Sequence, residues 1–163
     1  MPESLLHREG FTLIELVVVV GVLVVVLVSG LVAFDSAVRG NALKHYGYQL
    51  VQDLREARLN AFVRRKDDSW GVYFDDVSLL HGYTVFKGSA YVSRDPFYDR
   101  IITFPKPISF SQLNFPSSNE VVFSLSEGEA ADPGNLWLSA GNDGYFIQVN
   151  ALGLSDYNFY RWD

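Results

Sequence analysis

Residues 8–16 read Arg-Glu-Gly-Phe-Thr-Leu-Ile-Glu-Leu, and an almost pure valine and leucine run follows them as far as Phe34. Residues 16–34 contain no charge and no proline. A helix rises about 1.5 Å per residue, so residues 11–34 would span about 36 Å, against a hydrocarbon core of about 30 Å. A buried strand would be much shorter, since strands are typically about 3–10 residues long. The stretch therefore predicts a transmembrane helix over residues 11–34, with the lone acid Glu15 near its start.

The helical pattern continues through residues 35–66, which contain no proline. Apolar residues recur there every three or four positions, which is typical of a helix with one buried face. We therefore expect one helix from Phe11 to about Val63, and we expect Arg64, Arg65 and Lys66 in its last turn, where cations complement the helix dipole. The residues that form this stripe are Val38, Ala42, Tyr46, Leu50, Leu54, Ala57 and Ala61.

After Trp70 apolar residues recur at every second position instead of every third or fourth. Turns that contain glycine or proline separate these alternating segments. This pattern predicts an antiparallel β-domain over residues 67–163, whose hydrophobic face covers the helix stripe. The fold class expected for the whole chain is α+β. The predicted strands are 70–74, 82–86, 100–104, 108–115, 120–125, 135–138 and 144–149, and the segment 157–162 is a candidate last strand.

Composition limits the chemistry available to the 163 residues. The chain has no cysteine, which excludes disulfides, thiolate metal sites and cysteine nucleophiles. The net charge of −6 is unevenly distributed, because residues 39–66 carry seven basic and two acidic residues whereas residues 67–163 carry five basic and thirteen acidic ones. A basic helix thus precedes an acidic β-domain.

The segment Gly10-Phe11-Thr-Leu-Ile-Glu15, followed by a membrane-length apolar run, resembles the class III signal of type IV pilins and type II secretion pseudopilins. In that family a prepilin peptidase cuts after the glycine and N-methylates the new first residue, here Phe11. The glutamate that matches Glu15 acts in assembly. The alternative, an ordinary signal peptide cut near Ser36-Ala37, fits poorly because the apolar run is too long.

This resemblance implies four segments: a leader over residues 1–10, a transmembrane and assembly half-helix over 11–34, an amphipathic half over 35–66, and a β-domain over 67–163. It also implies a single-pass protein of the inner membrane. The N-terminus, from which the prepilin leader is removed, would face the cytoplasm, and the β-domain would be periplasmic or extracellular. The implied partners are the prepilin peptidase, other pilin or pseudopilin subunits, the inner-membrane assembly platform and the lipid bilayer. No cofactor is implied.

Weaker similarities point to a minor subunit. Leu54-Arg-Glu-Ala-Arg58 and the strand that opens on Trp70 are similar to H-type minor pseudopilins and FimT-like minor pilins. The chain departs from many major pilins, because its apolar run lacks a proline and it cannot form a C-terminal disulfide. The expected function is therefore that of a structural subunit of a pilus or a secretion pseudopilus.

Glu15 and the basic helix face each allow more than one interpretation. Glu15 could neutralise the Phe11 ammonium of a neighbouring subunit, pair within its own chain, or lie at the membrane interface as an exposed acid. The resemblance favours the first. The basic face of residues 39–66 could be a solvated helix side, a contact for anionic lipid headgroups or a DNA contact. The acidic β-domain argues against broad affinity for DNA.

Near the C-terminus, Tyr160, Arg161 and Trp162 either complete the sheet or form a stacking patch for a sugar or DNA. The acidic turns at residues 67–68, 75–76 and 142–143 could bind calcium, although surface acids are far more common than calcium sites. His7, His45 and His81 are spread over different segments, and no catalytic motif is present, so we expect no enzyme. The rival function is a membrane-anchored extracytoplasmic module that binds DNA, sugar or protein and does not polymerise.

Overall fold

The computed structural model describes residues 12–77, 81–116 and 118–162, and the side chains of residues 28–37 lie outside this description. The chain divides into two compact units, residues 1–38 and 39–163. The predicted leader and its junction at Gly10 and Phe11 fall outside the described residues.

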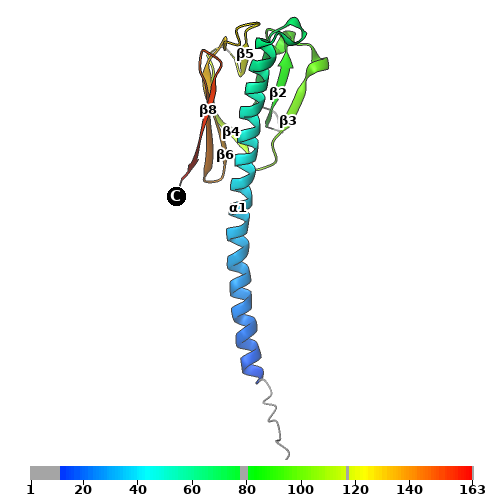
Figure 1. Ribbon diagram of the computed structural model, residues 1–163. Coiled ribbons are helices and arrows are strands. Elements are labelled where there is room, and N and C mark those ends of the chain that lie inside the picture. The colour runs from blue at the N-terminus through cyan, green and yellow to red at the C-terminus, as the bar shows by residue number, and fades with distance from the viewer. Residues whose placement is uncertain (1–11, 78–80, 117, 163) are drawn as a thin grey trace, which may run out of the picture. The chain divides into compact units, whose positions relative to one another are not determined.

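One long helix, α1, covers Leu13–Phe62 (Figure 1). This confirms the predicted single helix. The expected position of the three cations is wrong, because Arg64, Arg65 and Lys66 follow the helix rather than forming its last turn. Arg64 and Lys66 have left-handed backbone conformations with φ of 54° and 61°, which a right-handed α-helix does not allow, so α1 ends before them.

Within residues 12–77, 81–116 and 118–162, no helix has both the length and the apolar character needed to cross a membrane.

Every predicted strand is present, and the segment at the C-terminus forms an eighth. The strands are β1 (Trp70–Asp75), β2 (Gly82–Lys87), β3 (Arg100–Thr103), β4 (Ser109–Asn114), β5 (Glu120–Phe123), β6 (Gly134–Ala140), β7 (Asp143–Val149) and β8 (Ser155–Arg161). Three short 3₁₀ helices accompany them: η1 (Arg65–Asp67), η2 (Tyr91–Ser93) and η3 (Pro96–Tyr98).

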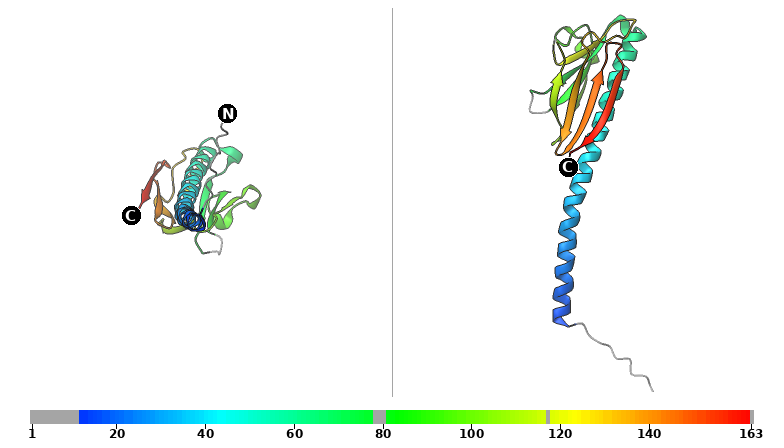
Figure 2. Two further views of the ribbon diagram at one scale, coloured as in Figure 1. Left: turned by 90° about the horizontal axis from the view of Figure 1, so that it is seen from below. Right: turned by 90° about the vertical axis from the view of Figure 1, so that its left-hand side faces the viewer.

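The strands form two antiparallel four-stranded sheets. The first has the order β3-β2-β1-β5 and the second the order β4-β6-β7-β8. The part of α1 after Arg39 lies between them, as the end-on view in Figure 2 shows. One core joins the three layers, since buried Leu50 and Leu54 of α1 belong to the same cluster as Phe74 of the first sheet and Ile147 of the second. The chain is therefore an α+β protein whose helix packs on antiparallel sheets.

The predicted apolar stripe of α1 is buried from Leu50 onward, but it omits several residues of α1 that are also buried. Leu50, Leu54, Ala57 and Ala61 are fully buried, whereas Val38 is 49% exposed. Two sheets bury a wider arc of the helix than one would, so additional residues are buried: Gly40, Leu43, Gly47, Val51, Asp53 and Asn60.

Candidate functional site

Thr12 and Glu15 form the start of α1. The Glu15 amide donates a hydrogen bond to Thr12 Oγ1 at 3.3 Å, and the Leu16 amide donates to the Thr12 carbonyl at 3.2 Å. Thr12 is thus the N-cap, and Glu15 stands three residues later, which is the spacing of a capping box. Its carboxylate also lies at the positive end of the helix dipole. Glu15 is exposed, so a neighbouring chain can reach its side chain.

The helix that follows is apolar on every side. The large apolar residues between Leu13 and Leu27 are each 49–82% exposed, and Gly21 among them is exposed as well. Soluble monomers rarely expose a contiguous apolar surface of this extent, so such a surface marks an interaction site.

Two basic residues of α1, Arg55 and Arg58, hydrogen-bond the backbone of the β-domain. Arg58 Nε donates to the carbonyl oxygens of Gly128 and Leu152, both at 3.1 Å, and Arg55 Nη2 donates to the Ser155 carbonyl at 3.3 Å. The solvated-side interpretation is therefore wrong for Arg58, which is partly buried and ties two loops to the helix.

Arg161, one of the candidate ligand-contact residues, faces α1. Its guanidinium forms two hydrogen bonds with the buried Asp143 carboxylate, at 2.7 and 3.1 Å. An added Cβ at Gly40 would lie 2.6 Å from Asp143 Oδ2, so only glycine allows the helix to approach this pair so closely. The Arg161 hydrogen bonds lower the pKa of Asp143 below its ordinary value, in spite of the opposing effect of burial.

Replacing Arg161 with glutamine should therefore destabilise the domain by about 1 kcal/mol at pH 7. Because the pKa of Asp143 is lowered by folding, this carboxylate contributes stability above its unfolded pKa and loses it as the pH falls through the folded pKa. The difference between wild type and Arg161→Gln should thus shrink below about pH 4. Urea unfolding at pH 7 and pH 3 measures it.

The matched control is Arg64→Gln, since Arg64 pairs at 3.0 Å with an exposed partner, Asp67. Exposed pairs contribute little, so this variant should match wild type at both values of pH. A difference for Arg161→Gln that is the same at pH 3 and pH 7 would show that packing, not the ion pair, is responsible.

Tyr160 and Trp162 lie on the opposite face of the second sheet, away from α1. There they join Trp137 of β6 and Phe146 of β7 in one aromatic cluster. The Trp137 ring centroid is 5.0 Å from Phe146, 5.1 Å from Tyr160 and 5.8 Å from Trp162. Tyr160 is 43% and Trp162 47% exposed. We call the side of the second sheet that carries these four rings the outer face.

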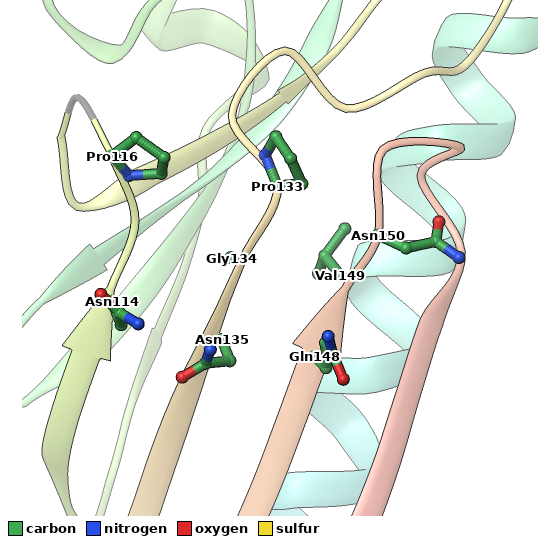
Figure 3. A pocket seen from close by; sticks show the side chains of 8 residues that line it. All are labelled: Asn114, Pro116, Pro133, Gly134, Asn135, Gln148, Val149 and Asn150. Atoms are coloured by element: carbon green, nitrogen blue, oxygen red, sulfur yellow. The ribbon is translucent and has the colours of Figure 1, made fainter.

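Side-chain amides continue the outer face toward the other end of the strands. Asn114 of β4 pairs in register with Asn135 of β6, which pairs with Gln148 of β7. These three residues line a hollow of about 330 Å³ together with Asn150 (Figure 3). In the part of the chain that the structure describes, the side-chain amides of Asn114, Asn135 and Gln148 make no hydrogen bond within the chain, and are therefore available to a ligand.

A second polar cluster ties α1 to the first sheet. Buried Tyr83 Oη donates to Asp53 Oδ2 at 2.6 Å, and Arg100 Nη2 donates to Asp53 Oδ1 at 2.7 Å and to Glu56 Oε2 at 3.0 Å. Burial raises the pKa of Asp53, while the Tyr83 hydrogen bond and the Arg100 charge oppose that rise. Asp53 thereby links α1 to the first sheet, and its neighbours Glu56 and Arg100 line a hollow of about 280 Å³ beside Tyr98.

The structure describes two of the three histidines and the acidic turns named as possible calcium sites. Among the described residues, no group of three or more histidine, cysteine or acidic side chains could hold a metal ion. His45 lies on α1 with its ring 5.3 Å from that of Tyr46, and His81 directly precedes β2. His7 falls outside the described residues.

No protein-family model matches the chain, and neither a curated protein nor a solved structure matches it.

Sequence reasoning found two residues of the outer face, Tyr160 and Trp162, and missed the others. The signal was present in β6, where Asn135, Trp137 and Ser139 alternate with the buried residues Leu136, Leu138 and Ala140. In a half-buried strand, the residues that alternate with the core are the ones that meet solvent. A tryptophan at such a position is a candidate contact residue.

Proposed function

We propose that this chain is a structural subunit, of minor type, of a filament of the type IV pilus or type II secretion pseudopilus kind. The observation that carries the proposal is the apolar helix surface over Leu13–Leu27, exposed on all sides in the single chain. In the proposal this surface is covered first by lipid, as a transmembrane segment of a single-pass inner-membrane protein, and then by the helices of neighbouring subunits. The membrane step rests on the sequence of residues 11–34 and on the family resemblance.

The pilin-like arrangement supports the proposal at the level of the fold. One helix of 50 residues carries the apolar surface in its first half, and its second half packs on antiparallel sheets. The apolar half has no polar face of its own, so it suits two environments of similar polarity, the bilayer and a bundle of helices.

Glu15 gives the assembly step its register in this proposal. A carboxylate in an apolar helix costs about 2.5–3.5 kcal/mol at the bilayer centre and less near its edge, so a compensating charge is favoured. After cleavage behind Gly10, the Phe11 ammonium of the adjacent subunit supplies that charge. The capping bond between the Glu15 amide and Thr12 Oγ1 involves only the backbone of Glu15, so it leaves the carboxylate available.

We expect Glu15→Ala to insert and to be processed, but to be depleted about tenfold or more from filaments, since it removes the charge partner of Phe11. The chain is co-expressed with a prepilin peptidase and the other filament subunits, its N-terminal mass is measured, and its amount in sheared filaments is compared with wild type. Glu127→Ala, which removes an exposed acid of the β-domain, is the control and should assemble normally.

Three results separate the possibilities. An N-terminus that stays uncut would contradict the pilin assignment. Normal incorporation of Glu15→Ala would contradict the role of Glu15 while retaining the filament. A chain that is processed but never found in filaments would favour the rival function, a membrane-anchored binding module, for which the outer face of the second sheet is the supporting observation.

A further inference from the structure

We propose that the outer face of the second sheet binds a neutral polysaccharide. This proposal does not depend on the filament assignment, because it concerns only β4, β6, β7, β8 and Trp162. It rests on three observations: a cluster of aromatic rings, of which Tyr160 and Trp162 are exposed and Trp137 and Phe146 half-buried, a neighbouring row of unpaired amides, and a near absence of charge.

The aromatic cluster forms a platform for sugar rings. Trp137 lies at its centre, with Phe146, Tyr160 and Trp162 each within 5.8 Å of it, centroid to centroid. The Trp162 indole packs against Gly144, where an added Cβ would lie 2.0 Å from its Cη2 atom. The electron-rich faces of aromatic rings attract the C–H groups on the apolar face of a pyranose ring. Four contiguous rings extend beyond a single sugar and suit a chain of them.

The amide row provides the polar part of the same surface. Asn114, Asn135 and Gln148 are consecutive partners across three strands, and Asn135 and Gln148 lie two residues along their strands from Trp137 and Phe146. Each side-chain amide both donates and accepts hydrogen bonds, as each sugar hydroxyl does. The hollow of about 330 Å³ that these amides line is at the lower end of the size of small-ligand sites (Figure 3). A ring stacked near Trp137 would thus have hydroxyl partners at its edge.

Charge selects a neutral glycan over a nucleic acid or an acidic sugar. Among the described positions of the outer face, Asp156, which pairs with Gln148 at one corner, is the only charged residue. Arg161 lies on the other face and is held by Asp143. Binding of single-stranded DNA by stacking needs a positively charged groove along the phosphates, and this face has no such groove.

Calorimetric titration of the full-length chain with neutral hexasaccharides tests the proposal. The set comprises the β-1,4-linked hexamers of glucose, N-acetylglucosamine, mannose and galactose and the α-1,4-linked hexamer of glucose. The chain is kept in a detergent without a sugar headgroup, because maltosides would compete. At least one hexamer should bind, and Trp137→Ala should weaken its binding about tenfold or more. Gln148→Ala should weaken it several-fold.

Controls separate loss of the site from loss of the fold. Phe97→Ala removes an aromatic ring that is 86% exposed and far from the outer face, and it should leave binding unchanged. If Trp137→Ala unfolds, Trp162→Ala tests the same platform from beyond the end of β8. Both variants are checked by thermal unfolding.

Three outcomes would overturn the proposal. One is that no hexasaccharide of the set binds. Another is that oligothymidylate binds instead, with steep salt dependence and loss in Trp137→Ala, which would assign the platform to single-stranded nucleic acid. The third is that the chain binds no sugar and self-associates in a Trp137-dependent way, which would make the outer face a protein interface.

Discussion

Replacing Gly47 with alanine is expected to destabilise the β-domain by about 1–3 kcal/mol, although alanine is the better helix former. The reason is the close approach of α1 to the second sheet. An added Cβ at Gly47 would lie 2.5–2.8 Å from three atoms of the Tyr145 ring. Tyr145 is 3% exposed and stacks on Tyr157 with centroids 5.4 Å apart, so its ring has little room to move. Urea unfolding followed by tryptophan fluorescence gives the free energy.

The same substitution elsewhere on the helix provides the matched control. An added Cβ at Gly21 meets no atom within 4 Å, so Gly21→Ala should not destabilise the chain. A smaller side chain at position 145 should relieve the clash, so Gly47→Ala combined with Tyr145→Leu should lose less than the sum of the two single losses. Strict additivity in that double variant would mean that Gly47 acts through the helix backbone rather than through Tyr145.

Gly47 also shows where sequence reasoning stops. The apolar stripe identified Leu50, Leu54, Ala57 and Ala61 correctly because their side chains carry the signal. Gly40 and Gly47 lie seven residues apart, two turns along one face, and they allow the second sheet to come close to the helix. A glycine has no hydrophobic side chain, so the period of apolar residues does not include it. The second sheet against α1 was therefore missed, although its strands were predicted.

The strands themselves were predictable because each has a period of two and a turn on either side. Their division into two sheets was not, since it depends on pairing between distant segments such as β1 with β5 and β4 with β6. The outer face arises from that pairing. Tyr160 and Trp162 could be chosen from the sequence because they lie in an aromatic segment. Only the register of β6, β7 and β8 shows that Trp137 and Phe146 lie beside them and that Arg161 lies on the other face.

The second large effect concerns Tyr83, whose hydroxyl group hydrogen-bonds the buried Asp53 carboxylate. Tyr83→Phe should lower the free energy of unfolding by about 1–3 kcal/mol at pH 7, because it removes a 2.6 Å hydrogen bond from a buried charge. Since this bond lowers the pKa of Asp53, its loss should raise that pKa further above the ordinary value. NMR titration of the Asp53 carboxyl carbon in wild type and Tyr83→Phe measures the change.

The pH dependence distinguishes this hydrogen bond from simple packing. A carboxyl whose pKa is raised by folding contributes stability below its unfolded pKa, about 4, and loses that contribution as the pH rises through the folded pKa. The loss should extend to higher pH in Tyr83→Phe, so its deficit should be small near pH 4 and grow toward pH 7. Asp53→Asn, which cannot ionise, should remove this pH dependence and gain stability relative to wild type as the pH rises. A Tyr83→Phe deficit of equal size from pH 4 to pH 7 would instead assign the hydroxyl group a contribution through packing alone.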